Sequence, residues 1–379
     1  MKKRIRVLQL QPDYHENSHN YSDLAEQIVA AFPRERYEVT SAFIRGKPVD
    51  GHPSSRAEKT IYFNFPKEAL RGLRLQLPGR IYRFCQERQF DVVICNRFKQ
   101  VSLMMMLNHF LKIPVCVGIS HGFGEYDAAW RRQRMRLLLD KSWYFVGVSP
   151  AVRDYLLAQK CGFTEENTTA IINAFDIQQA EAEQFSRHQA REILGLPQNA
   201  RIIGAAGRLV RIKGHIHLIR AFAEINKKHS DTYLAIIGEG REEAALKEEI
   251  CRLGMQDRIF LPGFYPGAKR YVKAFDLWAM PSLSEGLGLA LLEGMCGHLP
   301  VIGSKIPAMT PLIEGAGGIA VPPADAEALA NALDIFLSFS ASELAARGEK
   351  SYEYLCREHA IDDYRKKYLE LVEKALAAL

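Results

Sequence analysis

Residues 277–293 read Leu-Trp-Ala-Met-Pro-Ser-Leu-Ser-Glu-Gly-Leu-Gly-Leu-Ala-Leu-Leu-Glu, and this stretch decides the fold. Four apolar residues (277–280) predict a short buried strand, which a turn with two glycines joins to an apolar helix. Near-continuous apolar strands are typical of parallel sheets that helices cover on both faces. The stretch therefore predicts an α/β fold and a glycine-rich turn at the carboxyl end of a strand.

The same alternation of short apolar runs and helical periods continues along the chain in both directions. We expect strands at 5–10, 39–44, 91–95, 115–119, 144–148, 170–172, 202–206, 233–237, 259–261, 277–280, 301–303 and 319–321. We expect helical stretches between most of these strands, for example at 22–31, 149–158, 215–228 and 325–337, with a polar helical stretch over 177–194 and one tail helix over 361–379. Because 379 residues exceed one ordinary domain, two doubly wound domains follow.

Composition narrows the class of protein. Hydrophobic residues make up 47% and charged residues 25%, which excludes a disordered or fibrous chain. The seven cysteines are scattered and form no CxxC, which predicts free thiols in a reducing compartment. No signal peptide and no apolar stretch of membrane-spanning length is recognisable, so the expected location is cytoplasmic, with peripheral contact to the inner face of the membrane as an extension.

The turn before the helix of residues 277–293 is the strongest candidate for ligand binding. Backbone N–H groups at Gly286, Leu287 and Gly288 would point at an anion, and the helix dipole favours a phosphate there. Glu285 lies in the turn, and Glu293 lies about two helical turns further on, roughly on the same face. A carboxylate there can accept hydrogen bonds from a ribose diol, although a helix cap with a solvent-facing glutamate fits the same spacing.

Two further candidate turns follow strands of the second half. Arg208 and Lys213 flank a turn after the strand at 202–206 and suit a diphosphate, as bidentate donor and point charge, although a solvated basic loop has the same sequence. Gly238 begins a Gly-Glu-Gly turn whose third glycine position holds Glu243. The broken pattern favours an ordinary tight turn and disfavours a dehydrogenase.

Three histidines are candidates in the first half. His121 follows the expected strand at 115–119, where it would face the cleft or serve a structural role. His15 and His19 lie in a polar loop after the first strand and would contact an acceptor or plain solvent. Because the chain has no DxD, HExxH or Cys/His cluster, we expect no metal and no cofactor.

Taken together, these motifs resemble glycosyltransferase family 4, a class of retaining enzymes with the GT-B fold. The resemblance covers most of residues 149–335 and adds His121. In chain order it is carried by Ser149, Asn173, Gly207-Arg208, Lys213-Gly214, Gly238-Glu239-Gly240, Gly263-Phe264, Glu285, Glu293, Pro300-Val301-Ile302 and Pro322-Pro323-Ala324-Asp325. The chain departs from the family at residues 9–18, which lack the usual Gly-Gly turn, and at His298, where the family has glycine.

The resemblance implies an architecture and an activity. Two Rossmann-like domains would face each other across a cleft: residues 1–176 for the acceptor and 177–360 for a nucleotide sugar. Residues 361–379 would form a helix that crosses back to the first domain. The chain would be a metal-independent hexosyltransferase moving a hexose or N-acetylhexosamine, from a UDP-sugar before a GDP-sugar, to a glycan or glycolipid such as a lipopolysaccharide core.

The resemblance also assigns roles to the candidate residues. Arg208 and Lys213 would neutralise the diphosphate, and Glu293 would bind the ribose. Glu285 and His121 would contact the transferring sugar, and the backbone of Phe264 would lie against the base. A sugar-nucleotide epimerase of the same fold and a non-catalytic nucleotide-sugar-binding protein remain alternatives, and the presence of both Glu285 and His121 disfavours the second.

Charge is unevenly distributed between the two halves. Residues 1–170 carry 26 basic and 17 acidic side chains (+9), and residues 171–379 carry 24 and 27 (−3), which together give the net +6. Basic residues alternate with apolar ones near Arg71 and Arg74, and again near Arg132 and Arg134. Such segments favour an anionic membrane surface or a phosphorylated acceptor, or form a solvated helix face. Without recognised nucleic-acid motifs, we expect no nucleic-acid partner.

Overall fold

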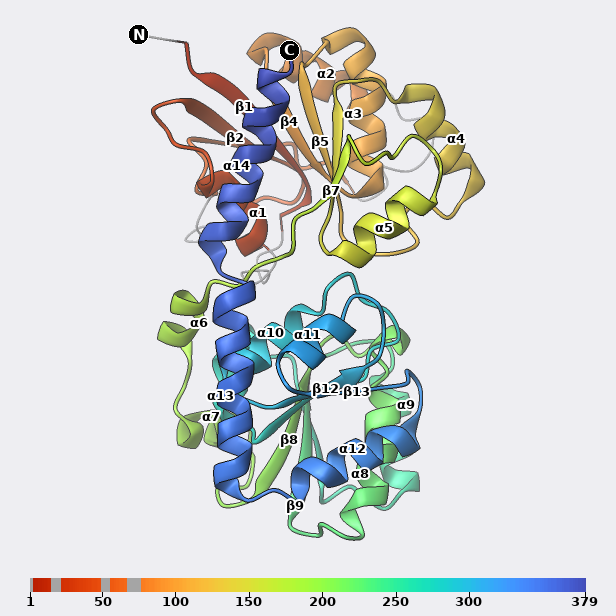
Figure 1. The fold of residues 1–379 in the computed structure, drawn as a ribbon, viewed down its shortest axis with the longest axis vertical. Coiled ribbons are helices and arrows are strands. Elements are labelled where there is room, and N and C mark those ends of the chain that lie inside the picture. Colours follow the sequence, from red (N-terminus) through yellow and green to blue (C-terminus); the bar gives the residue numbers. More distant parts are fainter. Residues whose placement is uncertain (1–2, 15–21, 49–54, 67–75) are drawn as a thin grey trace. The chain divides into compact units, whose positions relative to one another are not determined.

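The computed structural model describes residues 3–14, 22–48, 55–66 and 76–379. The chain divides into two compact units: Met1–Asn173 together with Ile361–Leu379, and Ala174–Ala360. Each unit is a parallel sheet with helices on both faces (Figure 1). This confirms the predicted α/β class with two Rossmann-like domains.

Among its described residues, the first unit contains a seven-stranded sheet of order β3-β2-β1-β4-β5-β6-β7. Its strands are β1 (Ile5–Asp13), β2 (Tyr37–Arg45), β3 (Lys59–Tyr62), β4 (Val92–Asn96), β5 (Val115–Ser120), β6 (Trp143–Gly147) and β7 (Thr168–Ala170). Its helices are α1 (Ser22–Ala30), α2 (Gln76–Arg88), α3 (Arg97–Leu111), α4 (Ala129–Leu138), α5 (Pro150–Ala158) and α14 (Ile361–Ala377).

The second unit contains a six-stranded sheet of order β10-β9-β8-β11-β12-β13. Its strands are β8 (Arg201–Ala206), β9 (Thr232–Ile237), β10 (Ile259–Gly263), β11 (Leu277–Met280), β12 (Val301–Ser304) and β13 (Ile319–Val321). Its α-helices are α6 (Ile177–Glu183), α7 (Arg187–Ile193), α8 (His215–Asn226), α9 (Glu243–Arg252), α10 (Leu289–Cys296), α11 (Thr310–Gly315), α12 (Ala326–Leu337) and α13 (Ala341–Glu358). Two 3-10 helices, η2 (Arg211–Lys213) and η3 (Ala268–Ala274), complete it.

All twelve predicted strands are present, whereas helices α2, α3, α4, α9, α11 and α13 lie outside the helix ranges given from the sequence. Strand β3 was missed because its four residues are only partly buried and lack a continuous apolar run. The polar stretch over 177–194 is two helices, because Ser186 begins α7 with a capping box in which its side chain and that of Gln189 satisfy each other's backbone N–H groups.

Alternating burial along the strands of the first unit separates two faces of its sheet. Leu8 and Leu10 of β1 and Cys95 of β4 belong to a core cluster with α2 and α3. The residues between them, such as Gln9 and Gln11, therefore point to the opposite face. This alternation places several buried polar side chains on one face of β1 and β4.

Helix α14 packs on the first unit, alongside α1 (Figure 1). Arg365 of α14 donates to the side-chain oxygen of Gln27 at 2.8 Å. Arg36 pairs with Glu373 of α14 at 2.7 Å. The last helix of the chain is thus held to the first unit by polar contacts as well as by buried residues such as Tyr368.

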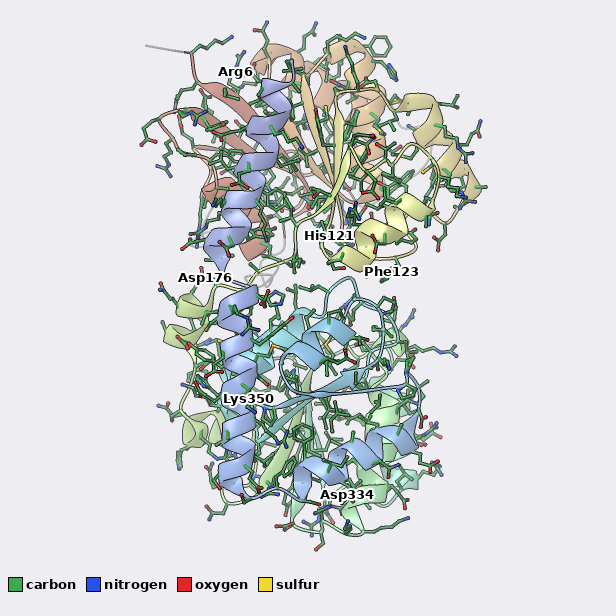
Figure 2. All side chains as sticks on the ribbon, in the orientation of Figure 1. Arg6, His121, Phe123, Asp176, Asp334 and Lys350 are labelled. Carbon is green, nitrogen blue, oxygen red and sulfur yellow. The ribbon has the colours of Figure 1, made fainter. Side chains whose placement is uncertain are left out.

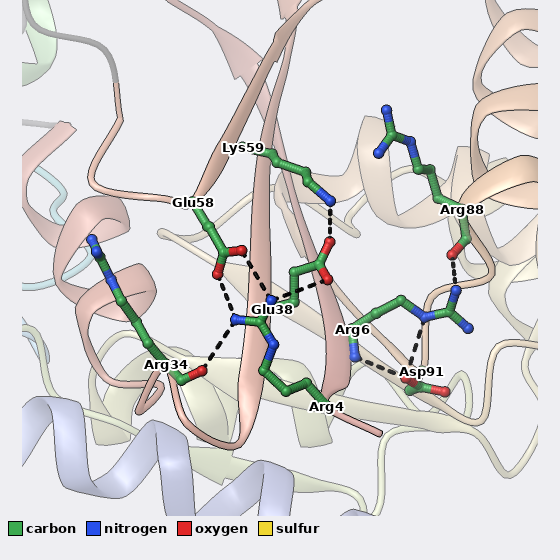
Figure 3. A network of polar contacts seen from close by, with 8 residues as sticks. All are labelled: Arg4, Arg6, Arg34, Glu38, Glu58, Lys59, Arg88 and Asp91. Atoms are coloured by element: carbon green, nitrogen blue, oxygen red, sulfur yellow. Dashed lines mark hydrogen bonds and ion pairs between the residues drawn. The ribbon is translucent and has the colours of Figure 1, made fainter. Parts of the chain in front are cut away.

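Part of the basic excess of the first half is paired within that unit (Figure 3). Arg4 forms ion pairs with Glu58 at 2.7 Å and Glu38 at 3.6 Å. Lys59 also pairs with Glu38, and Asp91 accepts a hydrogen bond from the backbone N–H of Arg6 at 2.8 Å. These ion pairs lie near the first residues of β1, β2 and β3. The positive charges of Arg4 and Lys59 are therefore compensated within the first unit.

Candidate active site

The loops at the carboxyl ends of β8 and β9 approach each other through glycine. Gly238 directly follows β9 with φ +153°, and a Cβ at this position would lie 2.0 Å from the carbonyl oxygen of Gly207. The loops are joined further by a hydrogen bond from the N–H of Leu209 to the carbonyl of Glu239, at 2.8 Å. Gly238 is therefore required by the packing of two loops, which explains the turn without a dinucleotide fingerprint.

The loop after β8 also contacts the loop after β11. Gly214 ends η2 with φ +67°, and a Cβ there would lie 2.1 Å from the carbonyl oxygen of Pro281. The N–H of Leu283 donates to the carbonyl of Ile212 at 2.7 Å. These contacts bring Lys213 next to the turn that contains Glu285.

Lys213 and Glu285 form an ion pair in which Nζ lies 2.6 Å from Oε1. Each side chain is 15% exposed, so the pair is largely shielded yet open to a ligand. The two residues lie 72 positions apart in the sequence, and the loop contacts join them. The pair gives the site one cationic and one anionic group at adjacent positions.

Glu293 lies on α10 and is half-buried. Burial raises the pKa of its carboxyl to about 7, although the positive charges of Lys269 and Lys213 oppose that rise. Lys213 therefore lies near both carboxylates. Because α10 begins only at Leu289, Glu285 lies before the helix, and the expectation that two helical turns separate Glu285 from Glu293 was wrong.

The remaining predicted residues of the second unit lie at the same carboxyl edge. Arg208 is exposed two residues after β8, and no carboxylate in the described ranges forms an ion pair with it. Phe264 follows β10 and is 45% exposed. Gly286, Leu287 and Gly288 form the turn before α10, in which Gly288 has φ +107°. Lys213 pairs with Glu285 and its charge acts on Glu293, whereas among the described residues neither Arg208 nor Phe264 forms a hydrogen bond or ion pair with these three.

The departure at His298 has a local explanation. His298 has φ +53°, the left-handed conformation that favours glycine. Its ring stacks on Tyr352 of α13 with centroids 3.9 Å apart, and its Nδ1 lies 2.8 Å from Glu349. These contacts offset the cost of the backbone conformation and attach the end of α10 to α13.

In the first unit, His121 follows β5 (Figure 2). Its Nε2 lies 2.8 Å from Oδ1 of Asn96, the last residue of β4. Burial, with a contribution from the positive charge of Arg97, lowers the pKa of His121 to about 4. The imidazole is therefore neutral at physiological pH and can act as a hydrogen-bonding group.

Glu125 was missed by the sequence analysis, although it organises this part of the first unit. Its carboxylate accepts hydrogen bonds from the backbone N–H groups of His121 and Phe98, each at 3.2 Å. It thereby ties the loop after β5 to the start of α3. Burial raises the pKa of Glu125, and the same N–H groups together with the positive charge of Arg97 oppose that rise. No local motif identifies this residue, since its partners are backbone atoms.

Of the residues predicted to contact an acceptor or a membrane, only two lie in the described part of the chain. His15, His19, Arg71 and Arg74 lie outside the described residues. Arg132 and Arg134 are half-buried on α4; Arg132 donates to the carbonyl of Tyr126 at 3.2 Å, and Arg134 lies 3.8 Å from the sulfur of Met106. Two large apolar residues of α4 are open to solvent: Trp130 is 59% exposed and Leu137 is 69% exposed.

A pocket of about 300 Å³ adjoins η2 in the second unit. It is lined by Val210, Arg211, His215, Ile216, His217, Glu242, Leu246, Leu283 and Ala324. None of the predicted donor residues belongs to this lining. Within residues 3–14, 22–48, 55–66 and 76–379, no group of three metal-ligating side chains is found. Across the same ranges, no helix has the length and hydropathy needed to span a bilayer.

Two family models match consecutive parts of the chain. The model described as "Glycosyl transferases group 1" matches residues 186–353, and "Glycosyltransferase Family 4" matches residues 24–179. An uncharacterized glycosyltransferase of Methanocaldococcus jannaschii is 30% identical over 66% of this chain and 67% of its own length.

Other relatives match over shorter stretches. The 2-deoxystreptamine glucosyltransferase of Streptomyces kanamyceticus is 30% identical over 38% of either chain. A lipopolysaccharide core biosynthesis mannosyltransferase of Rhizobium leguminosarum is 29% identical over 44% of this chain and 49% of its own length. The match to these two relatives thus spans about two fifths to one half of their length.

Solved structures share the whole architecture. Sucrose-phosphate synthase from Thermosynechococcus elongatus superposes over 99% of this chain and 100% of its own, with a TM-score of 0.80 and 19% identity. The Anabaena protein HepE in complex with UDP-glucose covers 98% of this chain and 100% of its own, with a TM-score of 0.78 and 19% identity. This likeness shows the GT-B fold.

Proposed function

The chain belongs to glycosyltransferase family 4, and from this premise we propose that it transfers a sugar from a UDP-sugar to a glycan or glycolipid acceptor with retention of anomeric configuration. One observation carries the proposal: the Lys213–Glu285 ion pair lies beside Glu293 at the carboxyl edge of the second sheet. Ligands of open α/β sheets bind at this edge.

The proposed donor complex follows from the charges of the second unit. The diphosphate lies near Lys213 and the exposed Arg208, with the N–H groups before α10 directed at a phosphate. Glu293 accepts hydrogen bonds from the ribose hydroxyls. Glu285 holds hydroxyls of the sugar close to the reacting carbon. UDP is favoured as the nucleotide because HepE, which has the same fold, binds UDP-glucose.

The proposed reaction breaks the bond between C1 of the sugar and the phosphate oxygen. As that bond lengthens, positive charge grows on the sugar ring and negative charge on the leaving phosphate, where Lys213 and Arg208 stabilise it. The acceptor hydroxyl attacks C1 on the face that the phosphate leaves, and its proton passes to the leaving phosphate oxygen. We propose that these side chains supply the charge compensation without a metal.

The proposed acceptor is a glycan or glycolipid of the lipopolysaccharide-core type. Several relatives are named for lipopolysaccharide core biosynthesis, which supports this choice. His121 of the first unit, neutral at physiological pH, is proposed to donate or accept a hydrogen bond at a sugar hydroxyl.

Opposite effects of the two ion-pair partners test the donor site. Lys213→Ala should weaken UDP binding, because a cation near the diphosphate is lost. Glu285→Ala should leave UDP binding equal or tighter, because an anion is lost, while transfer falls by about 10²–10³-fold. Isothermal titration with UDP and a UDP-glucose turnover assay measure both, in buffer with and without EDTA.

A matched control and two outcomes complete this test. Glu248→Ala removes an exposed carboxylate from α9 of the same unit and should change neither quantity. Full transfer by Glu285→Ala would reject the site, and loss of activity in EDTA would reject metal independence. Interconversion of the nucleotide sugar by the protein alone would identify an epimerase instead.

We also propose peripheral contact of the first unit with an anionic membrane, through Trp130 and Leu137. These exposed apolar residues lie seven positions apart on α4 and so share one helix face, next to the exposed Arg136. Trp130→Ser with Leu137→Ser should reduce sedimentation with phosphatidylglycerol vesicles. Ile335→Ser, which removes a 50% exposed apolar residue from α12, should not. Equal sedimentation of all variants would reject this surface.

A further inference from the structure

Hydrogen-bond donors without partners gather at the carboxyl edge of the first unit's sheet. Among the described residues, the side-chain nitrogens of Gln11 and Asn96 are buried and have no hydrogen-bond partner. Both residues are only 7% exposed. A buried donor without a partner costs free energy, so such groups need an explanation, and a missing ligand is one.

The register of β1 and β4 places these two side chains next to each other. Leu10 of β1 pairs with Cys95 of β4, and both belong to the core on one face of the sheet. Gln11 and Asn96 follow that pair by one residue, so alternation directs both to the opposite face on adjacent strands. Asn96 also holds the imidazole of His121 at 2.8 Å, which adds a third polar side chain to the cluster.

Arg97 adds a cation to this edge. It is exposed, and its φ of +65° is a left-handed conformation that is rare for residues other than glycine. Unfavourable backbone conformations of this kind tend to occur at functional positions. No side chain in the described ranges forms an ion pair with Arg97, although its charge is close enough to lower the pKa of His121 and to oppose the rise in the pKa of the Glu125 carboxyl.

The anion-binding end of α3 itself is already occupied. The N–H of Phe98, in the first turn, donates to the carboxylate of Glu125. A ligand at this edge therefore meets side-chain donors and not the end of the helix. The available groups are two amides, a neutral imidazole and a guanidinium, a set that suits an anionic group on a hydroxyl-rich molecule.

From this arrangement we infer that Gln11, Asn96 and Arg97 form an anion subsite that binds a phosphate or carboxylate group on the acceptor sugar. The inference rests on the proposed glycosyltransferase function, because it assumes that an acceptor occupies the first unit. It extends that function by naming the acceptor's charge and the residues that select it. Arg97 would contact the anion, and the amides of Gln11 and Asn96 would contact the same group or its neighbouring hydroxyl.

Binding measurements on small sugars test the subsite. Glucose 6-phosphate, glucuronic acid and glucose are titrated by ligand-detected NMR in saturating UDP, which fills the proposed donor site and keeps sugar phosphates out of it. The wild-type protein should bind at least one of the two anionic sugars about tenfold more tightly than glucose. Arg97→Met should abolish that preference, and Arg97→Lys should keep part of it. Arg83→Met, which removes another exposed arginine of the first unit, should retain it fully.

The outcomes separate the subsite from the donor site. A stronger response to glucose 6-phosphate identifies a phosphorylated acceptor, and a stronger response to glucuronic acid identifies a uronic acid; either supports the inference. The absence of an anionic preference, or its persistence in Arg97→Met, would overturn it. Failure of the wild-type protein to bind UDP would instead overturn the proposed function.

Discussion

The carboxyl edges of the two sheets are formed by different kinds of residue. In the second unit, Gly214 and Gly238 allow the loops after β8, β9 and β11 to approach one another closely. A Cβ added at either glycine would lie about 2 Å from a carbonyl oxygen of the neighbouring loop. In the first unit, long polar side chains such as Gln11, Asn96 and Arg97 occupy the corresponding strand ends. Glycine exposes backbone N–H groups, which suit a phosphate common to all nucleotide sugars. Side chains vary readily, which suits an acceptor that differs between enzymes.

The charges of the two edges differ in the same way. The second unit pairs Lys213 with Glu285 at 2.6 Å and places Glu293 near the lysine. The first unit shields its carboxylate, Glu125, with backbone N–H groups and leaves Arg97 without an ion-pair partner among the described residues. In the described part of the chain, one edge thus holds an ion pair before a ligand arrives, beside the unpaired Arg208, and the other holds buried side-chain donors without partners.

Replacing Glu293 by glutamine gives the largest expected effect on stability. The folded-state pKa of about 7 lies above the ordinary value of 4.5, so ionisation of Glu293 opposes folding. The stability that the protonated carboxyl of Glu293 contributes is complete below pH 4.5 and is lost as the pH rises through 7. Glu293→Gln should therefore unfold with a free energy up to about 3 kcal/mol higher at pH 8, and the gain should vanish near pH 4.5. Urea unfolding at both pH values measures the difference.

The UDP affinity of Glu293→Gln tests whether the same carboxylate binds the ribose. Wild-type affinity should rise between pH 6 and 8 as Glu293 ionises, whereas Glu293→Gln should bind weakly at both. Glu249→Gln is the control of opposite sign, because Arg252 and Arg220 lower the pKa of Glu249 to about 2. That variant should lose stability at pH 7 and keep UDP affinity. Equal pH dependence in wild type and Glu293→Gln would remove Glu293 from the donor site.

The same contrast explains how much could be predicted from the sequence. Glycine turns leave a recognisable pattern, so the loops with Lys213, Gly238 and Glu285 were identified, and apolar runs identified twelve of the strands. The Lys213–Glu285 contact was not predicted, since it joins residues from two loops. Glu125, Asn96 and Arg97 were missed because their roles depend on strand register and backbone contacts, which no local pattern records. Strand β3 was missed because it is half-exposed.

Introducing a side chain at Gly238 tests whether the second edge depends on glycine. A Cβ there would lie 2.0 Å from the carbonyl of Gly207, so the loops after β8 and β9 must separate. Gly238→Ala should destabilise the second unit by about 1–3 kcal/mol and weaken UDP binding. Gly254→Ala is the matched control, because Gly254 also has positive φ but no atom lies within 4 Å of its added Cβ. Loss of UDP affinity in both variants would point to general strain and not to loop contact.

Arg97→Gly is the converse of Gly238→Ala, because it removes a side chain from a position with positive φ. It has the smallest expected effect on stability. Glycine relieves the cost of φ +65° but makes the unfolded chain more flexible, so the net gain should be below about 1 kcal/mol. Lys112→Gly, at the end of the same helix with φ +56°, should give a similar gain. Only Arg97→Gly should remove the preference for glucose 6-phosphate or glucuronic acid over glucose. A clear loss of stability in Arg97→Gly but not in Lys112→Gly would show that the Arg97 side chain stabilises the first unit. Arg97 would then not be a donor that waits for a ligand, and the contrast between the two edges would fail.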